Sequence, residues 1–354
     1  MPAPVRLLSL ATASPPFEIA QAEVARVARE VFEDRFPLFG RMAPVFETAG
    51  IRTRQTVRPM EWYLQPQGWP ERTAAYLEGA VALFGDAAEA ALAEAGLTGA
   101  EVDIVVTASS TGIATPSLEA RAMARLGFRS DIARVPVFGL GCAGGATGLA
   151  LAARLAAATP GAVVLFVTVE LCSLAVRLDE LTKANIVATA LFGDGAAACV
   201  LRSGKVGGEA GFAEVSGFAE HTWPDTLDIM GWNVDPQGFG VVFAQAIPSF
   251  AQRNLRPAMD EMLAGQGLQI GDIDRFICHP GGTKVIEALE QSLGIEQGGL
   301  DHERAVLADH GNMSAPTCLF VLDRARRAGL PNRSVLTALG PGFTASTVTL
   351  RRAA

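Results

Sequence analysis

Gly139-Leu140-Gly141-Cys142-Ala143-Gly144-Gly145 joins a predicted strand at residues 134–138 to an Ala/Leu-rich helix that runs to about residue 158. Glycine on both sides of Cys142 permits a sharp turn and close approach of a substrate. The helix start offers free N–H groups and the positive end of its dipole, which stabilise a thiolate and lower the thiol pKa. Cysteine more often has a buried structural role, but this turn favours a nucleophile.

Strands and helices alternate on both sides of this turn. Further strands are expected at residues 102–107, 162–169, 196–201, 273–278, 335–338 and 347–350, and helices at residues 22–32, 73–95, 116–126, 250–263, 285–293 and 315–327. Residues 33–72 are expected to be irregular, and the glycine-rich residues 203–240 to be mostly loop or edge strand. Apolar strands alternating with helices indicate an α/β protein with a sheet covered on both faces.

The two halves of the chain echo each other. Residues 95–103 match residues 266–274 without a gap, and Asp103 pairs with Asp274. Further on, Gly193-x-Gly195 before one strand mirrors Gly340-x-Gly342 before another. Two echoes in the same order indicate an internal duplication. It divides the chain into residues 1–205 and residues 206–354.

The same spacing pairs Gly141-Cys142 with Gly311-Asn312, each before a helix. If the halves pack as a pseudo-dimer, both helix starts face one central site. Asn312 is also a favoured helix N-cap, so spacing alone leaves its role open. His279, in Cys278-His279-Pro280-Gly281-Gly282, closes an apolar strand at a position where α/β sheets deliver side chains to a site. It is the candidate to pair with Cys142 and to donate to an oxyanion.

Composition limits the class of protein. The net charge of −8 argues against a general nucleic-acid or anionic-membrane binder. The five cysteines include no C-x-x-C pair, which fits a reducing cytoplasm, and no metal-ligand pattern is present. Residues 6–13 are a first strand rather than a signal peptide, and no apolar stretch is long enough for stable membrane insertion.

An ordered set of motifs resembles the chalcone synthase family, which are the type III polyketide synthases. The resemblance is to a bacterial-type member of this family. The motifs are the Cys142 turn, Leu191-Phe192-Gly193-Asp194-Gly195, the His279 turn, Gly311-Asn312-Met313-Ser314 and Gly340-Pro341-Gly342-Phe343. The resemblance implies a homodimer with the thiolase fold, five αβαβα layers built from duplicated halves. It implies no cofactor, with malonyl-CoA and an acyl-CoA starter as substrates.

The resemblance also implies the roles of the site residues. Cys142 would carry the acyl chain, His279 would hold it as thiolate, and His279 and Asn312 would bind the thioester oxygen while malonyl-CoA loses CO₂. Phe192 would shield that step from water. The remaining cavity residues would be Cys172, Ala175, Val241, Thr115, Ser314, Gly340, Pro341 and Gly342. Arg52 and Arg54 match the family's basic cluster for the CoA phosphates only loosely.

Some cavity positions depart from the plant members. Cys172 and Ala175 replace threonines, and Val241 replaces a phenylalanine. The two smaller side chains, Ala175 and Val241, favour a long-chain fatty acyl starter and an alkylpyrone or alkylresorcinol product. The alternative is that neighbouring side chains refill the space.

Three rival functions remain open at this stage. A ketoacyl synthase that primes fatty-acid synthesis shares the Cys142, His279 and Asn312 set. A Cys-His-Asn hydrolase would act without malonyl-CoA, and it leaves the duplication unexplained. A non-catalytic acyl-CoA binder would not need the intact triad.

Overall fold

One nine-stranded sheet runs through the molecule, in which the computed structural model describes residues 4–204 and 211–353. Its first half contains β1 (Val5–Ala13), β7 (Asp194–Ser203), β6 (Val163–Leu171), β4 (Ile104–Ala108) and β5 (Ala133–Val137), side by side in that order. Its second half contains β8 (Ala213–Thr222), β13 (Thr344–Arg352), β12 (Arg333–Gly340) and β11 (Arg275–Cys278). The halves meet where the start of β1 pairs with β8, from Val5↔Val215 to Leu7↔Ala213. The boundary predicted between residues 205 and 206 lies outside the described residues.

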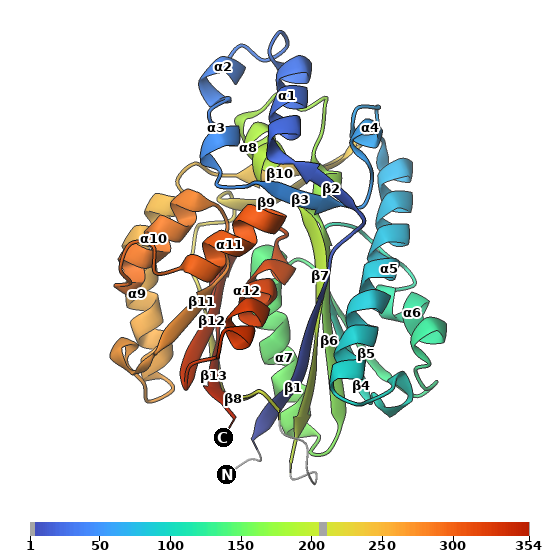
Figure 1. The fold of residues 1–354 in the computed structure, drawn as a ribbon, viewed down its shortest axis with the longest axis vertical. Helices are drawn as coiled ribbons and strands as arrows, with labels where there is room; N and C mark the ends of the chain where they lie inside the picture. Colours follow the sequence, from blue (N-terminus) through green and yellow to red (C-terminus); the bar gives the residue numbers. More distant parts are fainter. Residues whose placement is uncertain (1–3, 205–210, 354) are drawn as a thin grey trace.

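The helices complete five layers. Helices α7 (Gly144–Ala158) and α12 (Ala315–Arg327) touch strands of both half-sheets and form the middle layer. Helices α5 (Trp69–Glu94) and α6 (Leu118–Leu126) cover the outer face of the first half-sheet. On the opposite side of the molecule, α9 (Ile247–Ala264) and α10 (Thr283–Leu293) cover the second (Figure 1). The predicted αβαβα arrangement of the thiolase fold is confirmed.

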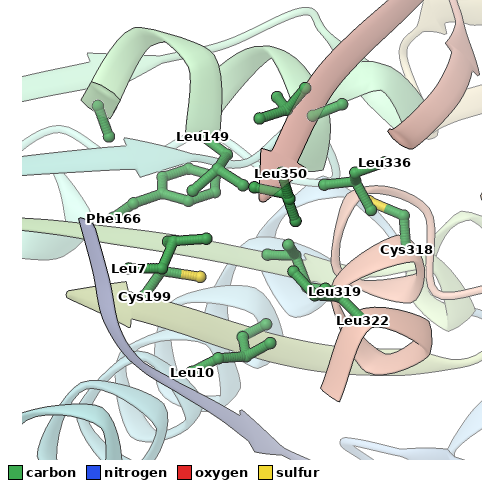
Figure 2. Packing of buried hydrophobic residues seen from close by; sticks show 14 of the residues in the cluster. Leu7, Leu10, Leu149, Phe166, Cys199, Cys318, Leu319, Leu322, Leu336 and Leu350 are labelled. Carbon is green, nitrogen blue, oxygen red and sulfur yellow. The ribbon is translucent and has the colours of Figure 1, made fainter. Parts of the chain in front are cut away.

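Strand β6 shows why its sequence is apolar throughout. Val164 and Phe166 point into the middle layer, whereas Val163, Leu165 and Val167 point toward α5. Because successive strand residues face opposite sides, a strand covered on both faces needs apolar residues at every position. Figure 2 shows Phe166 and Leu149 of α7 packing in a core that also holds Leu319, Leu322, Leu336 and Leu350.

Matching hydrogen bonds support the internal duplication. Asp103 donates its backbone N–H to the Val163 carbonyl at 3.0 Å and accepts from the Val163 N–H at 2.9 Å through its carboxylate. Asp274 makes the same pair of bonds with Arg333, at 2.9 and 2.8 Å. In both halves an aspartate therefore ties the entry of one strand to the entry of its parallel neighbour.

A smaller region caps one end of the sheet, at the top of Figure 1. It contains β2 (Phe17–Ala20) paired with β3 (Thr53–Thr56), and α1 (Gln21–Phe32), α2 (Phe39–Met42), α3 (Val45–Thr48) and α4 (Met60–Tyr63). Helix α8 (Lys183–Leu191) and the hairpin of β9 (Met230–Asp235) and β10 (Gly238–Phe243) join it. No helix among the described residues is long and apolar enough to cross a bilayer.

The structure differs from the predictions at three elements. Strand β8 falls within residues 203–240 but lies inside the nine-stranded sheet, between β13 and β1, rather than at an edge. Helix α8 and helix α11 (Asp301–His310) were not predicted. Apolar residues in both helices are scattered around the axis instead of forming one stripe, because α8 is covered on several sides and α11 is largely charged.

Candidate active site

Cys142, His279 and Asn312 line one cavity. They arrive from three places: the turn before α7, the end of β11, and the turn before α12. Nine other residues complete the lining, most of them apolar: Met230, Phe243, Ile247, Gly281, Val285, Leu289, Thr337, Ala338 and Leu339. The structure therefore brings together the three residues that were predicted from widely separated motifs.

Glycines allow the two helix starts to meet. A Cβ on Gly145, in the first turn of α7, would lie 2.3 Å from the Ala315 carbonyl oxygen and 2.5 Å from the Cys318 Sγ in α12. No side chain fits at that distance, so Gly145 sets how closely the helices approach. The predicted convergence of the Cys142 and Asn312 turns is thus observed.

The loop at the end of β12 packs against the turn that carries Cys142. Cys142 lies in a 3₁₀ turn, Gly141–Ala143, and a Cβ on Gly340 would lie 2.7 Å from the Ala143 nitrogen. Pro341 packs where a Cβ on Gly141 would be, at 2.7 Å. Gly340, Pro341 and Gly342 were predicted to line the catalytic cavity. They do not line it, whereas the preceding residues Ala338 and Leu339 do.

Burial controls the ionisation of Cys142. The side chain reaches the cavity, but burial raises the pKa of its thiol to about 11, with the negative charge of Glu170 adding to the rise and a hydrogen bond from Ser314 opposing it. The prediction that the helix start lowers this pKa was wrong, because loss of solvation outweighs it. Ser314, which was predicted to line the cavity, is not among the residues that line it, but its side chain hydrogen-bonds to the Cys142 thiol.

His279 presents an imidazole without protein partners among the described residues. Its backbone N–H donates to Thr337 at 2.9 Å, which fixes the residue at the end of β11. Both ring nitrogens are buried and lack a hydrogen-bond partner, and burial lowers the pKa of the ring to about 4. Cys142 and His279 are thus each favoured in the neutral form.

Asn312 is held on both sides of its backbone. Its N–H donates to Leu191 at 2.7 Å, and its carbonyl accepts from Gly193 at 3.1 Å. Its side-chain oxygen accepts from the Ser314 N–H at 2.8 Å, and its amide nitrogen donates one hydrogen to Gly281 at 3.2 Å. The second amide hydrogen is therefore available to a ligand in the cavity.

A buried carboxyl group behind Cys142 was not predicted. Glu170, at the end of β6, accepts two bonds from the Ser110 N–H, at 3.0 and 2.9 Å, and one from the Thr111 hydroxyl at 2.7 Å. The Ser110 hydroxyl in turn accepts from Gly139 and Gly141 in the nucleophile turn. Burial raises the pKa of Glu170 to about 8. A glutamate in an otherwise apolar strand was the available sequence signal.

The predicted cavity residues Phe192, Cys172, Ala175 and Val241 share one buried cluster and do not line the catalytic cavity. Trp232, the cross-strand partner of Val241, lies edge-on to Phe192 at 6.4 Å and donates its indole N–H to the Ser110 carbonyl at 2.8 Å. Trp232 therefore packs beside the smaller Val241 and Phe192 in this region.

Three other assignments need correction. Arg54 is buried and donates to the carbonyls of Thr189, Ala190 and Phe192, so it is a structural residue rather than a CoA ligand. Arg52 is exposed but pairs with Asp309. Thr115 is exposed in the segment before α6 and does not line the catalytic cavity.

A wide groove leads from the surface to the catalytic cavity. It has an open volume of about 1630 Å³ and shares Phe243, Gly281 and Val285 with the cavity. Three exposed cations that form no ion pair within the described residues line it: Arg41, Lys183 and Lys284. Lysine occurs at only three positions of the sequence, 183, 205 and 284, so its rarity was the signal that could have found two of them.

No cluster of His, Cys, Asp and Glu within residues 4–204 and 211–353 is arranged to hold a metal ion. The cavity presents a thiol, an imidazole and an amide. Together with the αβαβα layers, these three groups indicate a condensing enzyme of the thiolase fold.

Comparison with known proteins identifies the family. Residues 63–205 match the N-terminal domain, and residues 215–354 the C-terminal domain, of the chalcone and stilbene synthases. The 1,3,6,8-tetrahydroxynaphthalene synthase of Streptomyces peucetius subsp. caesius is 40% identical over 344 residues, covering 96% of this chain and 91% of the relative. The alpha-pyrone synthesis polyketide synthase-like Pks18 of Mycobacterium tuberculosis is 32% identical over 348 residues, covering 95% and 88%.

The crystal structure of 1,3,6,8-tetrahydroxynaphthalene synthase from Streptomyces coelicolor A3(2), a bacterial type III polyketide synthase, superposes with a TM-score of 0.92 at 28% identity, covering 99% of each chain. The protein belongs to the chalcone and stilbene synthase family and is a type III polyketide synthase, an acyltransferase.

Proposed function

We propose that the enzyme condenses malonyl-CoA repeatedly onto a starter held by Cys142. The observation that carries this proposal is the pair of donors in the catalytic cavity. Within the part of the chain that the structure describes, the imidazole of His279 has no hydrogen-bond partner, and the Asn312 amide in the same cavity keeps one free hydrogen. Two donors aimed at one oxygen stabilise the enolate that decarboxylation creates.

The steps follow from these groups. The Cys142 thiolate attacks the starter thioester carbon, and CoA leaves with the proton held by His279. Malonyl-CoA then loses CO₂, and the electron pair of the broken carbon–carbon bond forms an enolate whose oxygen accepts hydrogen bonds from His279 and Asn312. The enolate carbon attacks the Cys142 thioester, expels the thiolate and gives a chain longer by two carbons on CoA. Covalent capture divides one difficult reaction into two easier ones.

We infer a small starter, with malonyl-CoA itself as the leading candidate. Trp232 is the cross-strand partner of Val241 and packs edge-on against Phe192, so large aromatic rings lie beside the smaller residue. The relative at 40% identity is a tetrahydroxynaphthalene synthase. A naphthalene with oxygens on alternate carbons can be assembled wholly from malonyl units, without a larger starter.

A long-chain fatty acyl starter leading to an alkylpyrone or alkylresorcinol is the second candidate. The relative named for alpha-pyrone synthesis, at 32% identity, supports the alkylpyrone product class. The wide groove supports entry of a bulky acyl group as far as Phe243. Trp232 lies opposite Val241 and edge-on to Phe192, and the bulk of its indole supports the small starter instead.

The exposed cations of the groove suit the phosphates of CoA. Arg41 lies in α2, Lys183 at the start of α8 and Lys284 at the start of α10. None of the three pairs with an acidic side chain in residues 4–204 or 211–353, so the groove offers positive charge near the surface and an apolar path further in. That order matches a phosphorylated nucleotide followed by a thioester arm.

A homodimer is proposed as the assembled state. Strand β5 forms one edge of the nine-stranded sheet, and Ile113 and Phe138 beside it are 57% and 56% exposed. Large exposed apolar side chains that share one surface hollow are typical of an interface. Mass measurement in solution by light scattering tests this assignment.

The test of the function is an assay of purified enzyme with malonyl-CoA alone and with acyl-CoAs of graded length, with products identified by mass. Products from malonyl-CoA alone support the small starter. Products only with long acyl-CoAs replace it with the second candidate.

A further inference from the structure

The last residue of β11 before His279 is held by a buried carboxylate. Strand β11 is at the edge of the nine-stranded sheet and pairs only with β12. The His279 N–H points into that pairing and donates to Thr337 at 2.9 Å. The Cys278 N–H donates instead to Oε1 of Glu303 in α11, at 2.8 Å.

This hydrogen bond gives the Cys278 N–H an acceptor, without which the buried N–H would destabilise the fold. Cys278 and Glu303 are both fully buried, with 0% exposed area. A buried backbone N–H without an acceptor costs as much as a lost hydrogen bond or more. The other carboxylate oxygen of Glu303 lies 3.4 Å from the Arg275 guanidinium, and Arg275 also binds Asp301 at 2.8 Å. Glu303 is thus fixed from both sides.

The same helix leads to the second donor of the site. Helix α11 ends at His310, and after Gly311 the chain reaches Asn312. The Gly311 N–H still bonds back to Leu307 at 3.0 Å, so the turn carrying Asn312 is continuous with α11. Glu303 therefore joins the segment that ends in His279 to the segment that delivers Asn312.

We propose that Glu303 is a positioning residue that sets the distance between His279 and Asn312 and thereby the alignment of both donors on one oxygen. This inference rests on the proposed function, because the loss that it predicts is a lower rate of malonyl-CoA decarboxylation. A displacement of about 1 Å in a reacting group can cost on the order of 100-fold in rate.

The test compares Glu303→Ala, Glu303→Asp and Glu303→Gln with wild type, by CO₂ release from malonyl-CoA and by thermal unfolding. Glu303→Gln keeps the acceptor oxygen and is expected to retain kcat within about threefold of wild type. Glu303→Asp keeps charge but withdraws the oxygen by one methylene. Glu303→Ala and Glu303→Asp are expected to lose roughly 10- to 100-fold in kcat with little change in KM. If Glu303→Ala does not fold, Glu303→Asp decides.

Asp274→Ala is the matched control. Asp274 also accepts a strand N–H through its carboxylate, from Arg333, but at the far end of β11 from His279. It is expected to lose stability and keep kcat. Wild-type kcat in folded Glu303→Asp, or an equal loss in Asp274→Ala, would overturn the positioning role while leaving the proposed function standing. Absence of CO₂ release from wild type would overturn both.

Discussion

Phe192 and Asn312 are joined by an isolated parallel bridge between the two halves of the chain. The backbone of Asn312 bonds to the residues on either side of Phe192, at 2.7 and 3.1 Å. The side chains of Asn312 and Phe192 are therefore coupled through these backbone hydrogen bonds. On the far side of Phe192, Trp232 completes an aromatic wall. Under the proposed function, the size of the starter and the alignment of the Asn312 donor would depend on the same contacts.

Removal of Trp232 should widen the range of starters. Trp232→Ala is expected to accept longer acyl-CoAs than wild type, because the indole no longer fills the space beside Phe192 and Val241. Product masses across a graded acyl-CoA panel measure this. Trp223→Ala is the control: Trp223 is also half-buried, but it packs on Phe250 and Phe343 away from the catalytic cavity. An unchanged starter range in Trp232→Ala would show that other side chains limit the cavity.

The groove cations should act on the nucleotide part of the substrate. Lys183→Ala and Lys284→Ala are each expected to raise the KM for malonyl-CoA roughly two- to fivefold, with the effect shrinking at high salt. Malonyl-pantetheine, which lacks the nucleotide phosphates, should show no such difference. Arg52→Ala, whose cation is already paired with Asp309, serves as control. Equal effects on both substrates would contradict phosphate binding by these lysines.

The pH dependence of stability should reflect Glu170. Its pKa is raised to about 8 by burial, so its protonated form is favoured in the folded state. Its contribution to stability is fully present below the unfolded pKa near 4.5 and is lost as pH rises through 8.

Above about pH 7.5, one unit above its unfolded pKa of 6.5, His279 is neutral in both the folded and the unfolded state. Between about pH 7.5 and 9, urea unfolding of wild type should therefore show a falling free energy of unfolding, and Glu170→Gln a flatter curve. Parallel curves would mean that Glu170 ionises normally.

Gly340 should be intolerant of a side chain. A Cβ there would lie 2.5 Å from the Ala143 Cβ and 2.8 Å from the Leu140 carbonyl, so Gly340→Ala must displace the Cys142 turn. We expect a loss of at least tenfold in product formation and a lower melting temperature. Gly271→Ala, with no atom within 4 Å of the added Cβ, should behave as wild type. A fully active Gly340→Ala would refute the role assigned to this contact.

Residues with local signals were predictable from the sequence. The glycine turn around Cys142, the strand end at His279 and the echo between Asp103 and Asp274 each appear within a few residues, and the structure agrees with all three. Trp232 was missed because its importance comes from the strand register that places it opposite Val241. That register is a tertiary property.

Burial explains the remaining misses. Arg54 occurs in a basic stretch of sequence, and only the fold shows that α8 carbonyls consume its donors. The pKa of Cys142 was predicted from its helix start, whereas the depth of the cavity decides it. Strand β8 was not predicted inside the sheet because residues 203–240 are rich in glycine, which favours loops and edge strands.

The central claim is that Cys142, His279 and Asn312 together make carbon–carbon bonds from malonyl-CoA. The most direct measurement incubates wild type and Cys142→Ala with malonyl-CoA and follows both CO₂ release and product mass. We predict polyketide products from wild type, and from Cys142→Ala CO₂ release without extended products, because His279 and Asn312 remain. Wild-type enzyme that yields no extended product, with malonyl-CoA alone or with any acyl-CoA starter, would contradict the account.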